Sequence, residues 1–276
     1  VPITDLTVKD NSLIVATQGR SLWMVDDLTV IHQALQKSAR PEALLYKPKD
    51  SYRVQGRGGK ASLTAGTNLP NGVIFHYYLK NYDAEKDTVA IEITEADGTL
   101  IKRFATTDKK NALKPQAGGN QWVWDMRYDG AERLKGMIFW SASFSGAKAV
   151  PGEYKAVLTL NGASQTQDFT ILPSPKAEAT IADMKAQFSF VKAVNTTVDK
   201  AHKAIKKIRA LNKKIKDFEG NYKDEETAKT LIAESKALRE RLAAIEKALY
   251  QTQNRSNQDP LNFPIRLTYK LCHLNR

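Results

Sequence analysis

Apolar and polar residues alternate in short runs through most of the first 173 residues, which is the pattern of β-strands. In residues 1–30 this pattern predicts three strands, at 5–8, 13–17 and 21–25. Three short strands cannot bury their faces alone, so we expect them to be one piece of a larger sheet. Residues 31–42 are expected to be a linker, with a short helix that starts near Leu28 and a break at Pro41.

Residues 43–173 have the pattern of an all-β domain. Val89, Ile91 and Ile93 alternate with polar or small neighbours and therefore share one face of a predicted strand. A second strand places four large residues on one face, and these are Trp122, Trp124, Met126 and Tyr128. We expect all of these faces to lie in a core.

Turn signals separate these strands. Asp97–Gly98 and Asn161–Gly162 are dipeptides that favour tight hairpin turns. The glycine-rich stretch 55–70 is expected to be a long loop, because it lacks the spacing of a phosphate-binding P-loop and no helical pattern follows it. Short strands and turns at this spacing predict a β-sandwich.

A helical pattern replaces the strand pattern after Pro173–Pro175 and defines a region at 177–276. Apolar residues recur every three or four positions from Met184 to Phe218, and Gly220–Asn221 is expected to end this helix. A second stripe follows, made of Leu231, Ser235, Leu238, Leu242, Ile245 and Leu249. We therefore predict an antiparallel helical hairpin, with the start of a third helix after Pro264.

The charge is concentrated in the helical region. The chain carries 42 Lys and Arg against 30 Asp and Glu, a formal net charge of +12. Residues 176–251 hold 17 of these basic residues against 11 acidic ones, which is a net charge of +6. The stretch 200–216 has eight basic residues and no acidic one. Five lysines lie off the apolar stripe and form a candidate basic surface: Lys203, Lys206, Lys207, Lys213 and Lys214.

A basic amphipathic helix binds lipid headgroups, acidic glycans or nucleic acid in some proteins and is only a solvated face in others. The acidic stretch 224–226 lies across the predicted hairpin and is placed to neutralise these lysines. This favours the solvated face over specific binding, and we expect no nucleic-acid partner.

The residues that catalysis requires are not arranged for it. Asp26 and Asp27 are neighbours, so on a strand they point to opposite faces, and we expect them to end a strand and cap a helix. We expect Asp125 to make a turn contact or an ion pair with Arg127. Cys272 is the single cysteine and the four histidines have no ligand spacing, so no catalytic residue, metal site or cofactor is predicted.

Two aromatic residues are the remaining candidates for ligand binding. Trp140 and Phe144 lie in a predicted loop at 136–150, where an exposed ring can stack on a sugar. No apolar run is long enough to span a membrane.

Several motifs resemble one protein family. The run Ala16 to Leu28 (ATQGRSLWMVDDL) resembles the closing blade of large secreted bacterial proteins with sortilin-like, sialidase-type β-propellers, which are labelled glycosyl hydrolases. Gln18 stands where that family commonly has His. Three further segments are similar to the same family, in the same order: GNQWVWDMRY at 119–128, VPGEY at 150–154 and LNFPIRL at 261–267. GNQWVWDMRY and VPGEY, in this order, also resemble Ig-like domains.

The resemblance implies a fold class that is mixed and multi-domain. An all-β part, consisting of a propeller-blade remnant at 1–30 and an Ig-like β-sandwich at 43–173, is followed by an antiparallel α-helical hairpin. It also implies that the chain is the C-terminal third of a secreted or periplasmic protein. The Asp-box pattern of sialidase propellers does not occur.

Three functions follow as expectations. The first is a non-catalytic accessory module that binds a protein partner or a glycan. The second is one part of a glycoside hydrolase whose active site lies in the propeller. The third is a structural subunit that docks through its helical hairpin, which a long, bare apolar stripe would favour.

Overall fold

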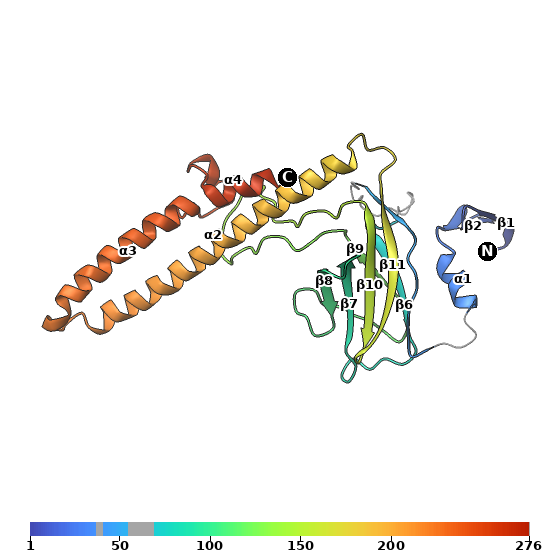
Figure 1. The fold of residues 1–276 in the computed structure, drawn as a ribbon, viewed down its shortest axis with the longest axis horizontal. Helices are drawn as coiled ribbons and strands as arrows, with labels where there is room; N and C mark the ends of the chain where they lie inside the picture. Colours follow the sequence, from blue (N-terminus) through green and yellow to red (C-terminus); the bar gives the residue numbers. More distant parts are fainter. Residues whose placement is uncertain (37–40, 55–68, 276) are drawn as a thin grey trace. The chain divides into compact units, whose positions relative to one another are not determined.

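The computed structural model describes residues 1–36, 41–54 and 69–275 (Figure 1). The predicted helix end at 37–40 and most of the predicted glycine-rich loop, 55–68, lie outside the described residues. The chain forms two compact units. The first consists of Val1–Tyr128 and Ala149–Met184, and the second of Asp129–Lys148 and Lys185–Arg276.

The N-terminal residues form a three-stranded antiparallel sheet of their own. Its strands are β1 (Ile3–Lys9), β2 (Ser12–Thr17) and β3 (Leu22–Val25), in that order. Helix α1 (Thr29–Leu35) follows directly. The strands and the helix agree with the predicted positions to within a few residues.

Two further sheets build the rest of the first unit. One has the order β5–β11–β10–β7–β8 and the other the order β4–β6–β9. The strands are β4 (Ala43–Leu45), β5 (Ser51–Arg53), β6 (Val73–Leu79), β7 (Val89–Glu95), β8 (Leu100–Ala105), β9 (Gly118–Trp124), β10 (Gly152–Leu160) and β11 (Ala163–Pro173). All described pairings in these sheets are antiparallel except that of β5 with β11.

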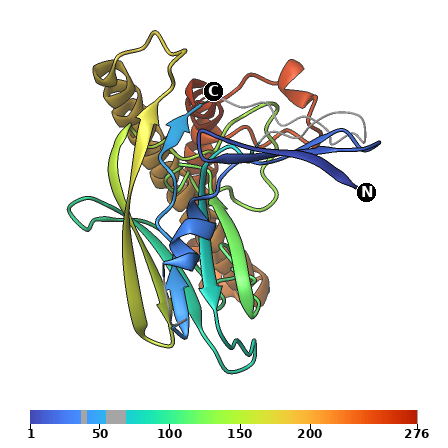
Figure 2. The same cartoon turned by 90° about the vertical axis from the view of Figure 1, so that its right-hand side faces the viewer.

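The two sheets share one core. Val89, Ile91 and Ile93 are buried in it from one sheet, and Phe75 and Trp124 from the other. The strands that contribute them can be followed in Figure 2, with β10 and β11 on one side and β6 and β9 on the other. Burial alternates along β6, because successive side chains of a strand point to opposite faces. The alternation in the sequence therefore identified Val89, Ile91, Ile93 and Trp124 correctly as core residues.

The two predicted hairpin turns are confirmed. Asn161 and Gly162 both have positive φ, 49° and 90°, which a two-residue type I′ turn requires, and they join β10 to β11. Gly98 has a φ of +92° between β7 and β8, and its N–H donates to the Glu95 carbonyl.

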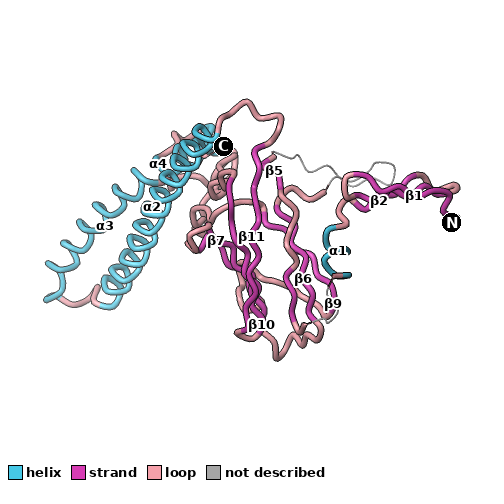
Figure 3. The backbone as a smooth tube through the Cα atoms, turned by 45° about the vertical axis from the view of Figure 1, so that its right-hand side comes forward, coloured by secondary structure: helices cyan, strands magenta, loops and turns pink. Residues whose placement is uncertain are grey.

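The second unit is built on one long helix. Helix α2 (Ile181–Asn221) has 41 residues and ends at the predicted stop. The short 3₁₀ helix η1 (Glu226–Ala228) leads into α3 (Lys229–Leu249), and η2 (Asp259–Leu261) precedes α4 (Leu267–Leu274). Figure 3, in which helices are cyan, shows α2 and α3 side by side.

The predicted fold class, an all-β part followed by an antiparallel α-helical hairpin, is wrong. The described residues form a mixed α/β chain with three sheets and four α-helices. Residues 129–148, which we expected inside the all-β domain, instead belong to the helical unit. The physical reason is that Ala131, Met137 and Phe139 are not part of the core between the two sheets. They are buried against helical residues such as Val194 and Ile205.

Candidate functional site

The segment 129–148 is tied to the helices of its own unit by hydrogen bonds. The N–H of Ile138 donates to the Tyr250 hydroxyl at 2.7 Å, and the N–H of Ser143 donates to the Cys272 carbonyl at 3.2 Å. The Tyr269 hydroxyl donates to the Trp140 carbonyl. These bonds give an irregular segment a defined path and decide which of its aromatic rings reach solvent.

The structure separates the two aromatic candidates of this segment. The Trp140 side chain is 48% exposed, as a sugar-stacking residue requires. Phe144 instead packs edge-on against Phe139 at 5.1 Å between ring centroids and lies near His202. The Phe144 ring therefore takes part in packing, whereas the Trp140 ring is open to solvent.

A buried histidine was not singled out by the sequence. His202 is 1% exposed, and its Nδ1 lies 2.5 Å from the Glu132 carbonyl oxygen. Because that oxygen only accepts, Nδ1 carries the proton. Among the described residues Nε2 has no hydrogen-bond partner. With Phe139 and Phe144 beside it, this imidazole serves to position residues 129–148 against α2.

The single cysteine is also a packing residue. Cys272 of α4 is 1% exposed and lies in a cluster with Ala131, Val194 and Val198. Burial raises the pKa of the Cys272 thiol to about 11, because the thiolate is poorly solvated there.

The burial of Cys272 predicts a thiol of low reactivity in the folded protein. The thiolate is the reactive form, and a pKa raised from 9.0 to about 11 lowers its population at pH 8 by about a hundredfold. We expect Ellman's reagent to modify the folded protein at least that much more slowly than the urea-unfolded protein. As a control, a Cys272→Ala, Thr196→Cys variant moves the thiol to an exposed position on α2 and should react rapidly. Equal rates for folded and unfolded wild type would contradict the buried placement.

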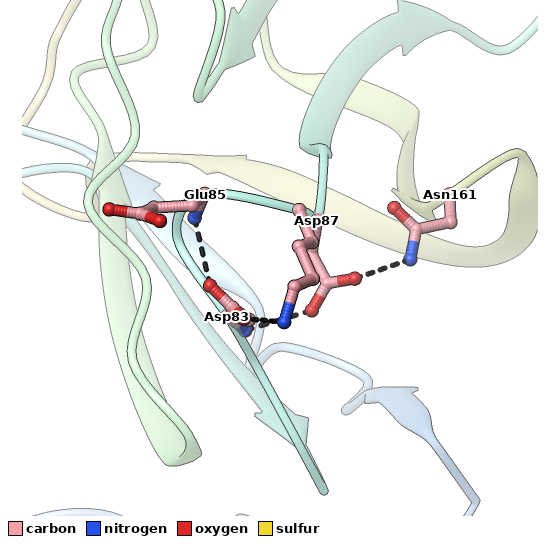
Figure 4. Close-up of polar contacts among 5 residues, drawn as sticks. Asp83, Glu85, Asp87 and Asn161 are labelled. Atoms are coloured by element: carbon pink, nitrogen blue, oxygen red, sulfur yellow. Dashed lines mark hydrogen bonds and ion pairs between the residues drawn. The ribbon is translucent and has the colours of Figure 1, made fainter.

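Four aspartates of the first unit make contacts within local turns and loops. Asp27 Oδ1 accepts from the Thr29 N–H at the start of α1, and Asp125 Oδ1 accepts from the Arg127 N–H. In the loop before β7, Asp83 is paired with Lys86, and the Asp87 carboxylate accepts from the Asp83 N–H and from Asn161 (Figure 4).

These contacts explain the acidity of the two loop carboxyls. The Lys86 side chain, followed by the Glu85 N–H, lowers the pKa of Asp83. The Asp83 N–H, followed by the Asn161 amide, lowers the pKa of Asp87. Over residues 1–36, 41–54 and 69–275, no group of three or more His, Cys, Asp or Glu side chains is placed to hold a metal ion.

The five candidate lysines all belong to α2, but they lie on different sides of the helix. All five candidates, Lys203, Lys206, Lys207, Lys213 and Lys214, are exposed. Successive residues of a helix are rotated by about 100°, so Lys207 and Lys214 lie on the side away from α3 whereas Lys206 and Lys213 lie on one broad side of the hairpin.

The expected neutralisation of these lysines is not present. Within the described part of the chain none of the five makes an ion pair. The acidic stretch is used locally instead, since Asp224 lies 3.9 Å from Lys223 and Glu226 lies 2.6 Å from Lys229. The positive charge of α2 is therefore left facing solvent.

Polar contacts hold α3 against the C-terminal half of α2. The Arg209 guanidinium donates to Glu246 at 2.7 Å, and Arg239 and Ser235 both donate to Glu219, at 2.6 and 2.8 Å. The Ser235 hydroxyl, followed by Arg239, lowers the pKa of Glu219. These contacts mark the sides on which the two helices face each other.

An apolar surface lies a quarter turn away from those contacts on both helices. The two helices are antiparallel, and the rotation has the same sense on each, so both sets of residues lie on the same broad side of the hairpin. We call this surface the hairpin apolar face. Its residues are Leu211, Ile215 and Phe218 of α2, Tyr222 directly after the end of α2, and Leu231, Leu238 and Ile245 of α3.

The hairpin apolar face is open to solvent. Leu231, Leu238 and Ile245 are 56%, 40% and 51% exposed, and Leu211 and Tyr222 are 41% and 42% exposed. No residue of α3 is buried. The sequence placed all of these residues except Tyr222 in the apolar stripes, but it did not show that one half of the α3 stripe lies a quarter turn away from the side that contacts α2. The seven-residue spacing of Leu231, Leu238 and Ile245 was the available signal.

Comparison with protein-family models and with curated proteins finds no match for this chain. The resemblance to secreted propeller proteins therefore stays a prediction. Within the described ranges, no helix combines the length and the apolar content that a membrane crossing requires.

Proposed function

We propose that this chain is a non-catalytic docking module and that its α2–α3 hairpin binds a protein partner through the hairpin apolar face. The observation that carries the proposal is the exposure of Leu231, Leu238 and Ile245 along the whole of α3. Large apolar surfaces that are continuous and rimmed by charge are typical of protein-binding sites. The resemblance to accessory regions of secreted proteins supports the same role and a secreted or periplasmic location.

The energetics of α3 support the proposal. A helix gains most of its stability in a protein by packing an apolar face, because isolated helices are marginal in water. Helix α3 has 21 residues and no buried one, although it carries an apolar row along its full length. Covering that row supplies the packing that α3 lacks.

Photo-crosslinking in the full-length protein tests the proposal. A benzophenone side chain in place of Leu238 should crosslink to one discrete segment of a protein partner. Leu261 is 69% exposed and lies outside the hairpin, so the same replacement there is the matched control. It should give no crosslink to that partner. Crosslinks to glycan or lipid, or none above the Leu261 control, would overturn the proposal.

The crosslinked segment then permits a binding measurement. Substituting Leu231, Leu238 and Ile245 together by Gln should weaken its binding by about a hundredfold, because several central apolar contacts are lost. Circular dichroism should be unchanged, since these side chains are exposed and Gln is a good helix former. Unchanged affinity with unchanged helicity would show that the face is not used.

A further inference from the structure

We infer that the occupant of the hairpin apolar face is one amphipathic α-helix of a partner protein, with carboxylates along the flank that meets Lys207 and Lys214. This inference rests on the proposed docking function and adds the chemistry of the partner.

The spacing of the apolar residues selects a helix. On α3 the exposed row is Leu231, Leu238 and Ile245, each seven residues from the next. On α2 Leu211 and Phe218 are also seven residues apart, and Ile215 is seven residues from Tyr222, which directly follows the end of α2. Seven residues are two helical turns, so a third helix that runs nearly along the hairpin meets the same surface every two turns.

The dimensions of the face agree with a single helix. Helix α3 has 21 residues and therefore a length of about 30 Å, which an occupant of about 20 helical residues would match. The Phe218 and Tyr222 rings lie 5.1 Å apart between centroids, so they form one continuous aromatic border at the end of the face near the turn. Two helices with apolar rows on the same side present a groove that one further helix fills.

The border of the face on α2 is positive. Lys207 precedes Leu211 by four residues and Lys214 precedes Phe218 by four, so each lysine lies next to an apolar residue of the face along the helix. Lys200 continues the same row at the same seven-residue spacing. These lysines are exposed, and no described residue pairs with them.

The charge also selects a foreign partner over a second copy of this chain. The border on α3 carries Glu234 and Arg241, which offset each other, so the border as a whole is positive. A second copy would bring another lysine row and another region with a net charge of +6 to the same surface. Like charges at an interface disfavour association, whereas carboxylates along the occupant's flank give complementary pairs.

Two synthetic peptides test this assignment. Both have about 21 residues, with Leu at the a and d positions of three heptads and Gln elsewhere. The acidic peptide has Glu at one flanking position of each heptad, and the basic peptide has Lys there. We expect the whole chain to bind the acidic peptide about tenfold more tightly in fluorescence anisotropy at low salt, since two or three surface charge pairs change sign.

Charge reversal provides the matched control. Lys207→Glu with Lys214→Glu should reverse the preference, so that the basic peptide binds more tightly. Lys206→Glu with Lys213→Glu makes the same change of charge at the same spacing but on the other broad side, and should keep the preference for the acidic peptide. Leu238→Gln should weaken the binding of both peptides, whereas Leu261→Gln should leave the binding of both unchanged.

The possible failures are distinguishable. If the acidic peptide does not bind, or if both peptides bind equally, the inference that the occupant is an acidic helix is wrong. A protein crosslink at position 238 would still support the docking function. If sedimentation shows a dimer that Leu238→Gln dissociates, the occupant is a second copy and the inference is overturned. If neither peptide binds and position 238 gives no protein crosslink, the docking function itself fails.

Discussion

Trp124→Ala is expected to lower the free energy of unfolding of the first unit by about 4 kcal/mol. Trp124 is completely buried in the shared core of the two sheets and meets the rings of Tyr154 and Phe169 at 6.1 and 6.2 Å. Its indole N–H donates to the Arg127 carbonyl at 3.1 Å. The substitution leaves a large cavity and removes the hydrogen-bond donor of that carbonyl, and neither loss is recovered by small movements in a packed interior.

Hydrogen exchange measured by mass spectrometry in increasing urea checks this prediction, because it reports the unfolding of β6 and β10 separately from that of the helices. Trp140→Ala is the matched control. Its side chain is 48% exposed, so we expect the exchange of these strands to stay within about 0.5 kcal/mol of wild type. A loss of less than about 1 kcal/mol for Trp124→Ala would mean that the ring is not in the core.

Gly130→Ala is expected to destabilise the second unit by about 3 kcal/mol. A Cβ atom at residue 130 would lie 1.9 Å from the Phe144 carbonyl oxygen and 2.7 Å from the Gly146 nitrogen. Both are backbone atoms and cannot rotate away. The segment 129–148 must therefore shift, and with it the Phe144 ring that packs against Phe139 and the helices.

The same hydrogen-exchange measurement tests this result, read from the proteolytic fragments that contain α4. Gly220→Ala is the matched control, because a Cβ atom there meets nothing within 4 Å and the residue lies in α2. Alanine is the better helix former, so this control should stabilise its unit by up to about 1 kcal/mol. If the Gly130→Ala variant shows the same hydrogen exchange in α4 as the wild type, the close backbone approach at residue 130 is contradicted.

Secondary structure followed from local patterns with few exceptions. The alternation that placed Val89, Ile91 and Ile93 in a core was correct, because in a strand the period of two directly sets which side chains face inward. Asn161–Gly162 was correctly assigned to a hairpin turn, because few residues tolerate two successive positive φ angles. The stop of α2 at Gly220–Asn221 was also correct.

The candidate site followed from the sequence only in part. The lysines of α2 are exposed as predicted, but their neutralisation by residues 224–226 was not found, since Asp224 and Glu226 pair with lysines adjacent to them. Phe144 was a candidate for ligand binding, and its ring packs against Phe139 and lies near His202 of α2. Which side chains these residues meet depends on the packing of the whole unit, and short-range patterns carry no information on that.

The sequence by itself determined where strands, turns and helices lie, because these depend on side-chain period and on the backbone preferences of a few residues. Only the tertiary structure decided that residues 129–148 join the helices and that one row of α3 contacts α2 while the row of Leu231, Leu238 and Ile245 stays open. Apolar residues favour burial, but their pattern does not specify which surface will bury them, because the hydrophobic effect is non-directional. The partner of each apolar face is therefore set by the packing of the whole chain.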